Sequence, residues 1–361
     1  MKSFKKDIRN KVQKMSDKCL KRYHIGSLIL ALFALFDVET LKKIELGPIS
    51  NIANTVDNFA APFLDIFENS IIKVFLLALF VIISLLRIYK YFIRPKAIII
   101  NHSSFSNTQS TYDPGIVSGY SVKEKEINVV DQMAHNNIVD AIRAQDALIE
   151  EVVRDCDSNT ELLYYGIAHT PLIFRAGFQV GDEGRVRLLH KYRNDQPYFR
   201  EISSEPDALS VRMEPIKVQS TKSSNEMLVV IATSLPIKDE ELVCFQRSNY
   251  CCRLYFQMKE NGMYGFDSVV SYATMARLKT DILREIRENV ISKGIQKIHL
   301  VLSASSDFTF YLAQGFSKNH DPEIVVYHYD RNANNKYPWG ISNISTPANA
   351  VVRHTNHQPV D

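Results

Sequence analysis

Two apolar runs lie near the start of the chain, and neither carries the polar stripe of a helix on the surface of a soluble protein. The first, at 25–36, reaches the roughly 20 residues of a membrane-spanning helix when it is extended to 23–41. The second, at 74–86, approaches the same length when it is taken as 71–93. The pattern therefore predicts a two-helix transmembrane hairpin between residues 23 and 94.

The residues that flank these two runs distinguish membrane spans from other kinds of apolar segment, and they predict the orientation of the chain in the membrane. Asp37, Val38 and Glu39 follow the first run in place of a small-residue cleavage site, which disfavours a signal peptide. A soluble helical hairpin is the other alternative. Nine lysines and arginines precede the first run within 1–22, whereas the connection 37–70 has two. Because basic residues favour the cytoplasmic side, we expect both chain termini in the cytoplasm.

From residue 97 onward, short apolar runs that end in polar turns alternate with amphipathic stretches. This alternation is typical of buried parallel strands joined by helices. The expected elements fall into two similar sets. The first set has strands at 97–100, 161–167 and 185–192 and helices at 137–155 and 171–178; the second has strands at 228–231, 297–302 and 323–329 and helices at 272–292 and 307–316.

The two sets recur at a nearly constant offset. Ile98 and Val229 in the first strands are 131 residues apart, and Leu163 and His299 in the second strands are 136 apart. We therefore predict an α/β protein with two tandem Rossmann-like units. The expected domains are a basic arm at 1–22, the hairpin region at 23–94, the first unit at 95–225, the second unit at 226–350 and a tail at 351–361.

Composition narrows the classes of function. The net charge of +3 is too small to indicate a chain that binds DNA or RNA polymers. The five cysteines form no Cys-x-x-Cys pair and have no histidine cluster beside them, so we expect neither a disulfide scaffold nor a metal site. Neither unit contains a Gly-x-Gly-x-x-Gly or Walker sequence, which disfavours an ordinary nicotinamide or nucleoside triphosphate site. We expect no cofactor.

Several segments carry a resemblance to a known family. The stretches LLYYGIAHTPLIFRAGF and VRLLHKY in the first unit, and KIHLVLSAS, LAQGF and VVYHYDRNANNKYPW in the second, resemble the two halves of a SAVED domain. SAVED domains are similar to two fused CARF units and sense cyclic oligonucleotides in anti-phage systems of the CBASS type. With two membrane spans ahead of it, the chain resembles the transmembrane SAVED effectors of bacterial inner membranes.

The expected ligand site follows from the position of strand ends, because ligands bind outside the carboxyl ends of strands in open α/β sheets. Hydroxyls and basic side chains suit phosphodiesters, and aromatic faces suit bases. Helix capping by the serines and threonines, and packing of the tryptophan against a sheet, are the alternatives. The candidates are His102, Ser103, Ser104, His169, Thr170, Arg193, Thr233, Ser234, Ser303, Ser305, Ser306, Arg331 and Trp339, with Phe105, Tyr112 and Tyr329 as further aromatic candidates for stacking a base.

The resemblance implies a membrane-anchored sensor without catalytic residues. Its expected ligand is a cyclic di- or trinucleotide made by a cognate nucleotidyltransferase. Binding is expected to drive assembly into a homo-oligomer that permeabilises, or conducts ions through, the lipid bilayer. The alternatives are a membrane-tethered receptor that signals to a partner and a ring nuclease, for which the histidines beside serines at 102 and 169 are the only indication.

Overall fold

The computed structural model describes residues 70–92, 94–106, 111–181, 186–192, 198–205, 213–219, 224–246, 250–258, 264–265 and 267–354. The chain divides into two compact units, Met1–Pro95 and Lys96–Asp361. Each unit is described by itself below.

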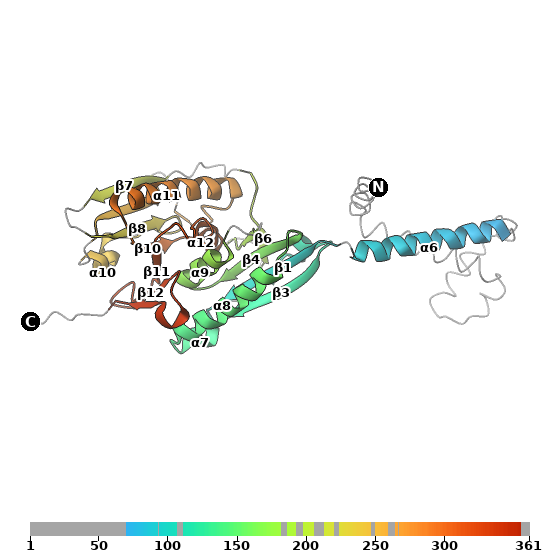
Figure 1. Cartoon of the computed structure of the whole chain (residues 1–361), viewed down its shortest axis with the longest axis horizontal. Helices are drawn as coiled ribbons and strands as arrows, with labels where there is room; N and C mark the ends of the chain where they lie inside the picture. The colour runs from blue at the N-terminus through green and yellow to red at the C-terminus, as the bar shows by residue number, and fades with distance from the viewer. Residues whose placement is uncertain are drawn as a thin grey trace, which may run out of the picture. The chain divides into compact units, whose positions relative to one another are not determined.

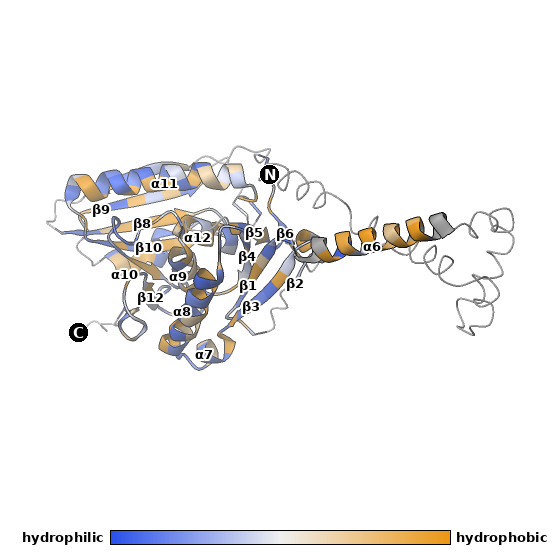
Figure 2. Ribbon diagram, turned by 45° about the vertical axis from the view of Figure 1, so that its right-hand side comes forward, coloured by the Kyte–Doolittle hydropathy of each residue, from blue (hydrophilic) through white to orange (hydrophobic). Residues whose placement is uncertain are grey.

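The described part of the first unit is one long helix, α6 (Ser70–Phe92). Figure 2 shows that it is largely hydrophobic, and several of its large apolar side chains are exposed, among them Phe75 and Ile82. The second expected span, 71–93, falls on this helix, whereas the first, 23–41, lies outside the described residues together with the basic arm. None of the helices in the described part of the chain combines the length and apolar character that crossing a bilayer requires.

The second unit begins with a six-stranded sheet in the order β2-β6-β5-β4-β1-β3 (Figure 1). Strands β5, β4, β1 and β3 are mutually parallel, β6 is antiparallel to β5, and β2 is parallel to β6. The apolar run from Ile98 to Ile100 makes β1 a buried central strand. The strands are β1 (Lys96–Ser103), β2 (Thr111–Tyr112), β3 (Ser121–Asn128), β4 (Thr160–Ile167), β5 (Val186–His190) and β6 (Tyr198–Glu201).

A seven-stranded sheet follows, in the order β13-β12-β11-β10-β8-β9-β7. Strands β9, β8, β10 and β11 are mutually parallel, and the outer strands β7, β12 and β13 pair antiparallel. The strands are β7 (Met213–Gln219), β8 (Glu226–Ala232), β9 (Cys252–Met258), β10 (Lys297–Ser303), β11 (Glu323–Tyr327), β12 (Trp339–Ser342) and β13 (Val351–Arg353).

The two sheets share one topology, and this confirms the α/β fold and the internal repeat predicted from the sequence. The order β3-β1-β4-β5-β6 in the first sheet corresponds to β9-β8-β10-β11-β12 in the second, with the same strand directions. Sequence reasoning missed β3 and β9, the strands that flank the first strand of each copy. In β3 the charged run Lys123–Glu126 conceals the strand, because this sheet edge faces solvent.

Two segments lie outside the halves to which the sequence assigned them. Strand β7 pairs with β9 in the second sheet, although the predicted boundary would place it in the first unit. Strand β13 pairs with β12, although it lies in the predicted tail. In both cases an edge strand from a neighbouring segment completes the sheet of the second half.

Helices cover the sheets and join the halves. The remaining helices are α7 (Val130–Ala134), α8 (Ile138–Asp155), α9 (Thr170–Val180), α10 (Val243–Gln246), α11 (Tyr272–Lys293) and α12 (Ser306–Ala313), with 3-10 turns η2 (Pro114–Val117), η3 (Asp239–Leu242) and η4 (Pro347–Asn349). Helix α9 of the first half packs against α12 of the second half. Gly177 permits this close approach, because a Cβ there would clash with the carbonyl oxygen of Phe310 and lie 3.0 Å from the Cβ of Ala313. One hydrophobic core therefore runs through both halves, with Tyr164 stacked on Phe310 at 3.9 Å between ring centroids.

Candidate functional site

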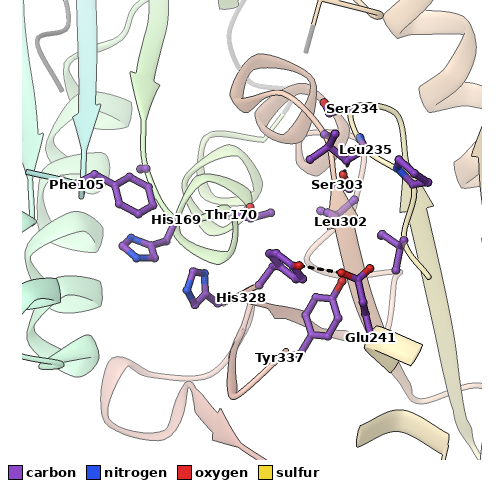
Figure 3. Close-up of a pocket in the computed structure, with 15 residues that line it drawn as sticks. Phe105, His169, Thr170, Ser234, Leu235, Glu241, Leu302, Ser303, His328 and Tyr337 are labelled. Atoms are coloured by element: carbon purple, nitrogen blue, oxygen red, sulfur yellow. Dashed lines mark hydrogen bonds between the residues drawn. The ribbon is translucent and has the colours of Figure 1, made fainter. Parts of the chain in front are cut away.

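A cavity of about 260 Å³ opens where the carboxyl ends of parallel strands from both halves meet (Figure 3). It lies beyond β1 and β4 of the first half and beyond β8, β10 and β11 of the second half. The lining residues are Phe105, Ala168, His169, Thr170, Ser234, Leu235, Pro236, Ile237, Glu241, Leu302, Ser303, Ala304, His328, Tyr329 and Tyr337.

The wall formed by the first half is built around His169, which directly precedes α9. Its backbone N–H donates to the Ser104 hydroxyl at 2.8 Å, and its Nδ1 lies 2.5 Å from the same hydroxyl. The ring of Phe105 stacks on the His169 ring with centroids 4.1 Å apart. Ser104 therefore fixes both the backbone and the ring of His169, on which the Phe105 ring packs.

A row of aromatic rings connects the two halves at the cavity. The His169 ring meets the His328 ring edge to face at 4.7 Å, and the His328 ring stacks on Trp339 at 4.7 Å. Trp339 is nearly buried at 7% exposure and does not line the cavity. It therefore supports His328 from behind.

The wall formed by the second half is organised by Ser303 at the end of β10. Its carbonyl oxygen accepts from the backbone N–H groups of Thr233 and Ser234 at 2.8 and 2.9 Å, and its hydroxyl accepts from that of Leu235 at 3.0 Å. These bonds hold the turn after β8 against the cavity. Within the described part of the chain, the buried Ser234 hydroxyl has no hydrogen-bond partner.

Glu241 contributes a carboxylate from η3. The Tyr329 hydroxyl donates to Oε1 at 2.8 Å, and the backbone N–H of Lys238 donates to Oε2 at 3.0 Å. Figure 3 shows Glu241 and Tyr337 on the side of the cavity opposite Phe105 and His169. The two bonds orient the carboxylate before any ligand binds.

Burial makes the histidines of this region neutral near pH 7. Burial, with a smaller contribution from the charge of His328, lowers the pKa of His169 to about 3. Burial likewise lowers the pKa of His328 to about 4 against a weaker opposing effect of Asp330. Among the described lining residues, Glu241 is the only acidic one, and none is a lysine or an arginine.

The structure brings some of the predicted residues together and places others elsewhere. His169, Thr170, Ser234 and Ser303 line the cavity, and Ser104 orients His169. His102 is fully buried, with its Nδ1 3.0 Å from the Tyr164 hydroxyl in the core. Arg193 lies outside the described residues. The others do not line the cavity: Ser103 and Thr233 are buried, Ser305 and Ser306 lie at the start of α12, and Arg331 is exposed in the turn after β11.

Sequence reasoning did not select His328 or Glu241 as site residues. The strand expected at 323–329 ends at Tyr327, so His328 follows it directly, and the aromatic candidate Tyr329 comes next. Correct placement of that strand end would have found His328. Glu241 had no comparable signal, because it reaches the cavity from a short 3-10 turn that begins seven residues after the end of β8.

Among the described residues, no group of three or more His, Cys, Asp or Glu side chains could hold a metal ion.

Comparisons with known sequences and structures indicate which proteins the chain is similar to. A search of curated protein sequences finds no match. The structure of the Acinetobacter baumannii Cap4 SAVED/CARF-domain containing receptor with the cyclic trinucleotide 2'3'3'-cAAA is 12% identical, with a TM-score of 0.44, and the alignment covers 79% of this chain and 60% of that one. The corresponding receptor from Moraxella osloensis is 13% identical, with a TM-score of 0.36 and coverage of 74% and 58%. The chain thus spans about 60% of the length of these receptors.

A family model gives the assignment. The model of SAVED, the "SMODS-associated and fused to various effectors sensor domain", matches residues 145–342, which is more than half of the chain. The match runs from α8 in the first half to β12 in the second and therefore includes most of the cavity wall. The chain belongs to the SAVED family of sensor domains.

Proposed function

We propose that the chain is a sensor that binds a cyclic di- or trinucleotide in the cavity between its two halves. The observation that carries this proposal is the position of the cavity. The cavity lies beyond the carboxyl ends of parallel strands in both halves, where open α/β sheets bind ligands. The chain itself belongs to a family of sensor domains.

The groups at the cavity suit a nucleotide. Helices α9 and α12 begin at Thr170 and Ser306, directly after β4 and β10, and helix N-termini favour phosphate groups. The buried Ser234 hydroxyl is available to a ligand that enters the cavity. Phe105 lies on the wall opposite Glu241 and is 39% exposed, so the base of a further nucleotide unit of the ring can stack on it at the edge of the cavity. These groups together provide donors for a phosphodiester and a surface for a base.

The size of the cavity limits how much of a ring it holds. Pockets that enclose drug-sized ligands have volumes of roughly 300–1,000 Å³. At about 260 Å³ this cavity suits one nucleotide unit, so the remaining units of a cyclic ligand lie at its rim.

We propose that the chain binds this ligand without degrading it. The contact between Ser104 and His169 resembles a nucleophile with its base, but Ser104 is only 3% exposed. A histidine whose pKa is lowered to about 3 is also a weak general base at neutral pH. Incubation of the full chain with its ligand, followed by chromatography, tests this point. Loss of intact ring at a rate that Ser104→Ala abolishes would establish a ring nuclease instead.

Binding itself is tested with the full chain and a panel of cyclic di-, tri- and tetranucleotides in a thermal-shift assay. A ligand at about a hundred times its dissociation constant adds roughly 2.7 kcal/mol of stability, which gives a clear shift. The variant Ser234→Ala, which removes the hydroxyl, should weaken binding of the ligand that gives the shift. Ser345→Ala, which alters a half-exposed serine away from the lining residues, should not. If a folded sample shows no thermal shift with any nucleotide of the panel, the proposal is wrong.

For the effector step, we propose that the N-terminal region acts on the bacterial inner membrane, with both termini in the cytoplasm. The support is the exposed apolar surface of α6, which includes Val74, Phe75, Val81, Ile82 and Leu85. The length and hydropathy of the described helices do not favour a span there, so this proposal depends on the first apolar run as well. Ligand from a cognate nucleotidyltransferase would assemble copies of the chain and permeabilise the bilayer in anti-phage defence.

Liposomes containing a self-quenching dye test the effector step with the purified full chain. Dye release that requires both the chain and its ligand would support permeabilisation. Flotation with the liposomes but no release would favour a tethered receptor that signals to a partner. Failure to float would contradict membrane attachment.

A further inference from the structure

The carboxylate of Glu241 is an unusual group for a pocket that takes an anionic ligand. It is half-buried in the wall of the cavity and is the only acidic group among the described lining residues, none of which is a lysine or an arginine. A carboxylate repels phosphate, and on its own it weakens binding of a phosphodiester. Glu241 must therefore face a part of the ligand that carries hydrogen-bond donors.

The position of this carboxylate is fixed from two sides. The Tyr329 hydroxyl and the Lys238 backbone N–H each donate to one of its oxygens. A carboxylate has about four acceptor sites, so each oxygen retains capacity for a further donor. An acceptor held in this way makes a directional contact with little loss of side-chain freedom on binding.

The surroundings of Glu241 suit a base. Tyr329 is 39% exposed, and its ring lies 5.5 Å from that of Tyr337, so two aromatic rings lie beside the carboxylate. The hydroxyl and helix N-termini that favour phosphate come from other segments, namely Ser234, α9 and α12. The polar groups of the cavity are thus divided between a place for a base and a place for phosphate.

We propose that Glu241 selects the nucleobase of the bound ring by accepting a hydrogen bond from its exocyclic amino group. The inference rests on the proposed function and specifies the ligand class further. Adenine, guanine and cytosine carry an amino group on the Watson–Crick edge. Uracil presents a carbonyl oxygen where cytosine has its amino group, and hypoxanthine does so in place of that of adenine, and a carboxylate repels this oxygen. In place of the guanine amino group hypoxanthine has only a hydrogen on carbon, which donates no hydrogen bond of comparable strength. The favoured ligand has an amino-bearing base at this position.

Matched pairs of cyclic trinucleotides test the proposal, because only one ring of each pair carries the amino group. In the adenine and cytosine pairs a neighbouring ring nitrogen also changes from acceptor to donor, whereas guanine and hypoxanthine differ by the amino group alone. The pairs are cyclic triadenylate with triinosinate, triguanylate with triinosinate, and tricytidylate with triuridylate. Calorimetry with the full chain should show at least one amino-bearing ring bound about tenfold or more tightly than its partner, since a hydrogen bond to a charged acceptor has that effect.

Variants then assign the discrimination to Glu241. Glu241→Gln keeps the shape but offers an amide that can donate as well as accept, so the ratio of the two dissociation constants should fall toward one. Tyr329→Phe removes the hydroxyl that orients the carboxylate and should lower the ratio less. Glu240→Gln alters the adjacent exposed acid, which does not line the cavity, and should leave the ratio unchanged.

The ratio is informative even if a variant loses overall stability, because destabilisation affects both rings of a pair alike. Equal affinity of the unaltered chain for both rings of every pair would overturn the role of Glu241 and leave the sensor function standing. An unchanged ratio in Glu241→Gln would do the same. Absence of binding to every ring would overturn the proposed function and this inference together.

Discussion

Arg175 donates from Nε and Nη2 to the two carboxylate oxygens of Asp146, at 2.9 and 2.6 Å, and both side chains are almost fully buried. Its remaining N–H groups donate to the backbone carbonyls of Ser342 and Ser345, at 2.5 and 3.0 Å. Arg175 and Asp146 lie in α9 and α8 of the first half, whereas Ser342 ends β12 and Ser345 follows it in the second half. One guanidinium therefore joins the halves that form the cavity.

Removal of this guanidinium should destabilise the fold strongly. Arg175→Met leaves Asp146 as an uncompensated buried charge and two carbonyl groups without their donor, so we expect a loss of about 3–5 kcal/mol. Urea unfolding measures the change. Arg143→Met is the matched control, because its pair with Asp140 is exposed and should contribute less than about 1 kcal/mol. Similar losses in both variants would contradict the role of Arg175.

The crossing of α9 and α12 should depend on the absence of a side chain at position 177. Gly177→Ala places a methyl group against the Phe310 carbonyl, and overpacking of this kind costs about 1–3 kcal/mol. Thermal unfolding measures the loss. Gly265→Ala should be nearly neutral, because a Cβ there meets nothing within 4 Å. An unchanged melting temperature in Gly177→Ala would show that the helices lie further apart.

His190 predicts a loss of stability at alkaline pH. Burial alone lowers the pKa of this histidine, but the charges and hydrogen bonds of Asp307 and Asp267 outweigh it and raise the pKa to about 9. Because the folded pKa exceeds the unfolded value of about 6.5, the stabilisation is complete below pH 6.5. It disappears as the pH rises toward 9, and its size is roughly 3 kcal/mol.

Urea unfolding at a series of pH values tests this prediction. The unaltered chain should lose stability between pH 6.5 and 9, and His190→Gln should be less stable at pH 6 and show a flatter profile. His135→Gln alters an exposed histidine and should keep the slope of the unaltered chain. Parallel slopes in His190→Gln and the unaltered chain would exclude His190 as the titrating group.

Phe105 should contribute to ligand affinity through stacking. Its ring lies on His169 and lines the cavity, and base–aromatic stacking contributes about 1–3 kcal/mol per base. Phe105→Ala should therefore weaken binding of the cyclic ligand by about tenfold or more, measured by calorimetry, with little change in melting temperature. Tyr198→Ala removes an aromatic ring of similar exposure that lies away from the cavity and should not alter affinity. If Phe105→Ala and Tyr198→Ala bind the cyclic ligand with equal affinity, no base stacks on Phe105.

The sequence alone predicted much of the fold because its pattern is local. The apolar run at Ile98–Ile100 lies between polar segments, which is typical of a buried strand. The spacing of apolar residues in 138–155 predicts the helix α8. The recurrence of this pattern after about 130 residues predicted two similar halves, which the matching strand orders confirm. Edge strands such as β3 and β7 escaped notice, because charged or alternating residues at a sheet edge do not differ from those of a loop.

The candidate site was predictable in its location and only partly in its residues. The rule that ligands lie beyond strand ends led to His169, Thr170, Ser234 and Ser303, all of which line the cavity. Side chains alternate between the faces of a strand, so a small error in where a strand ends exchanges core residues for site residues. That is why His102 lies in the core with Tyr164, while His328 was overlooked.

The sequence by itself determined the strands and helices of the repeating pattern and the family, since these depend on periodicity and on motifs within short segments. Only the tertiary structure decided which residues distant in the sequence meet, such as Ser104 with His169 in the first half and Glu241 with Tyr329 in the second half. These partners are 65 and 88 residues apart, and no local pattern connects them. The parallel pairing of β1 with β4 brings Ser104 to His169, and the packing of α9 against α12 brings the strand ends of both halves to one cavity.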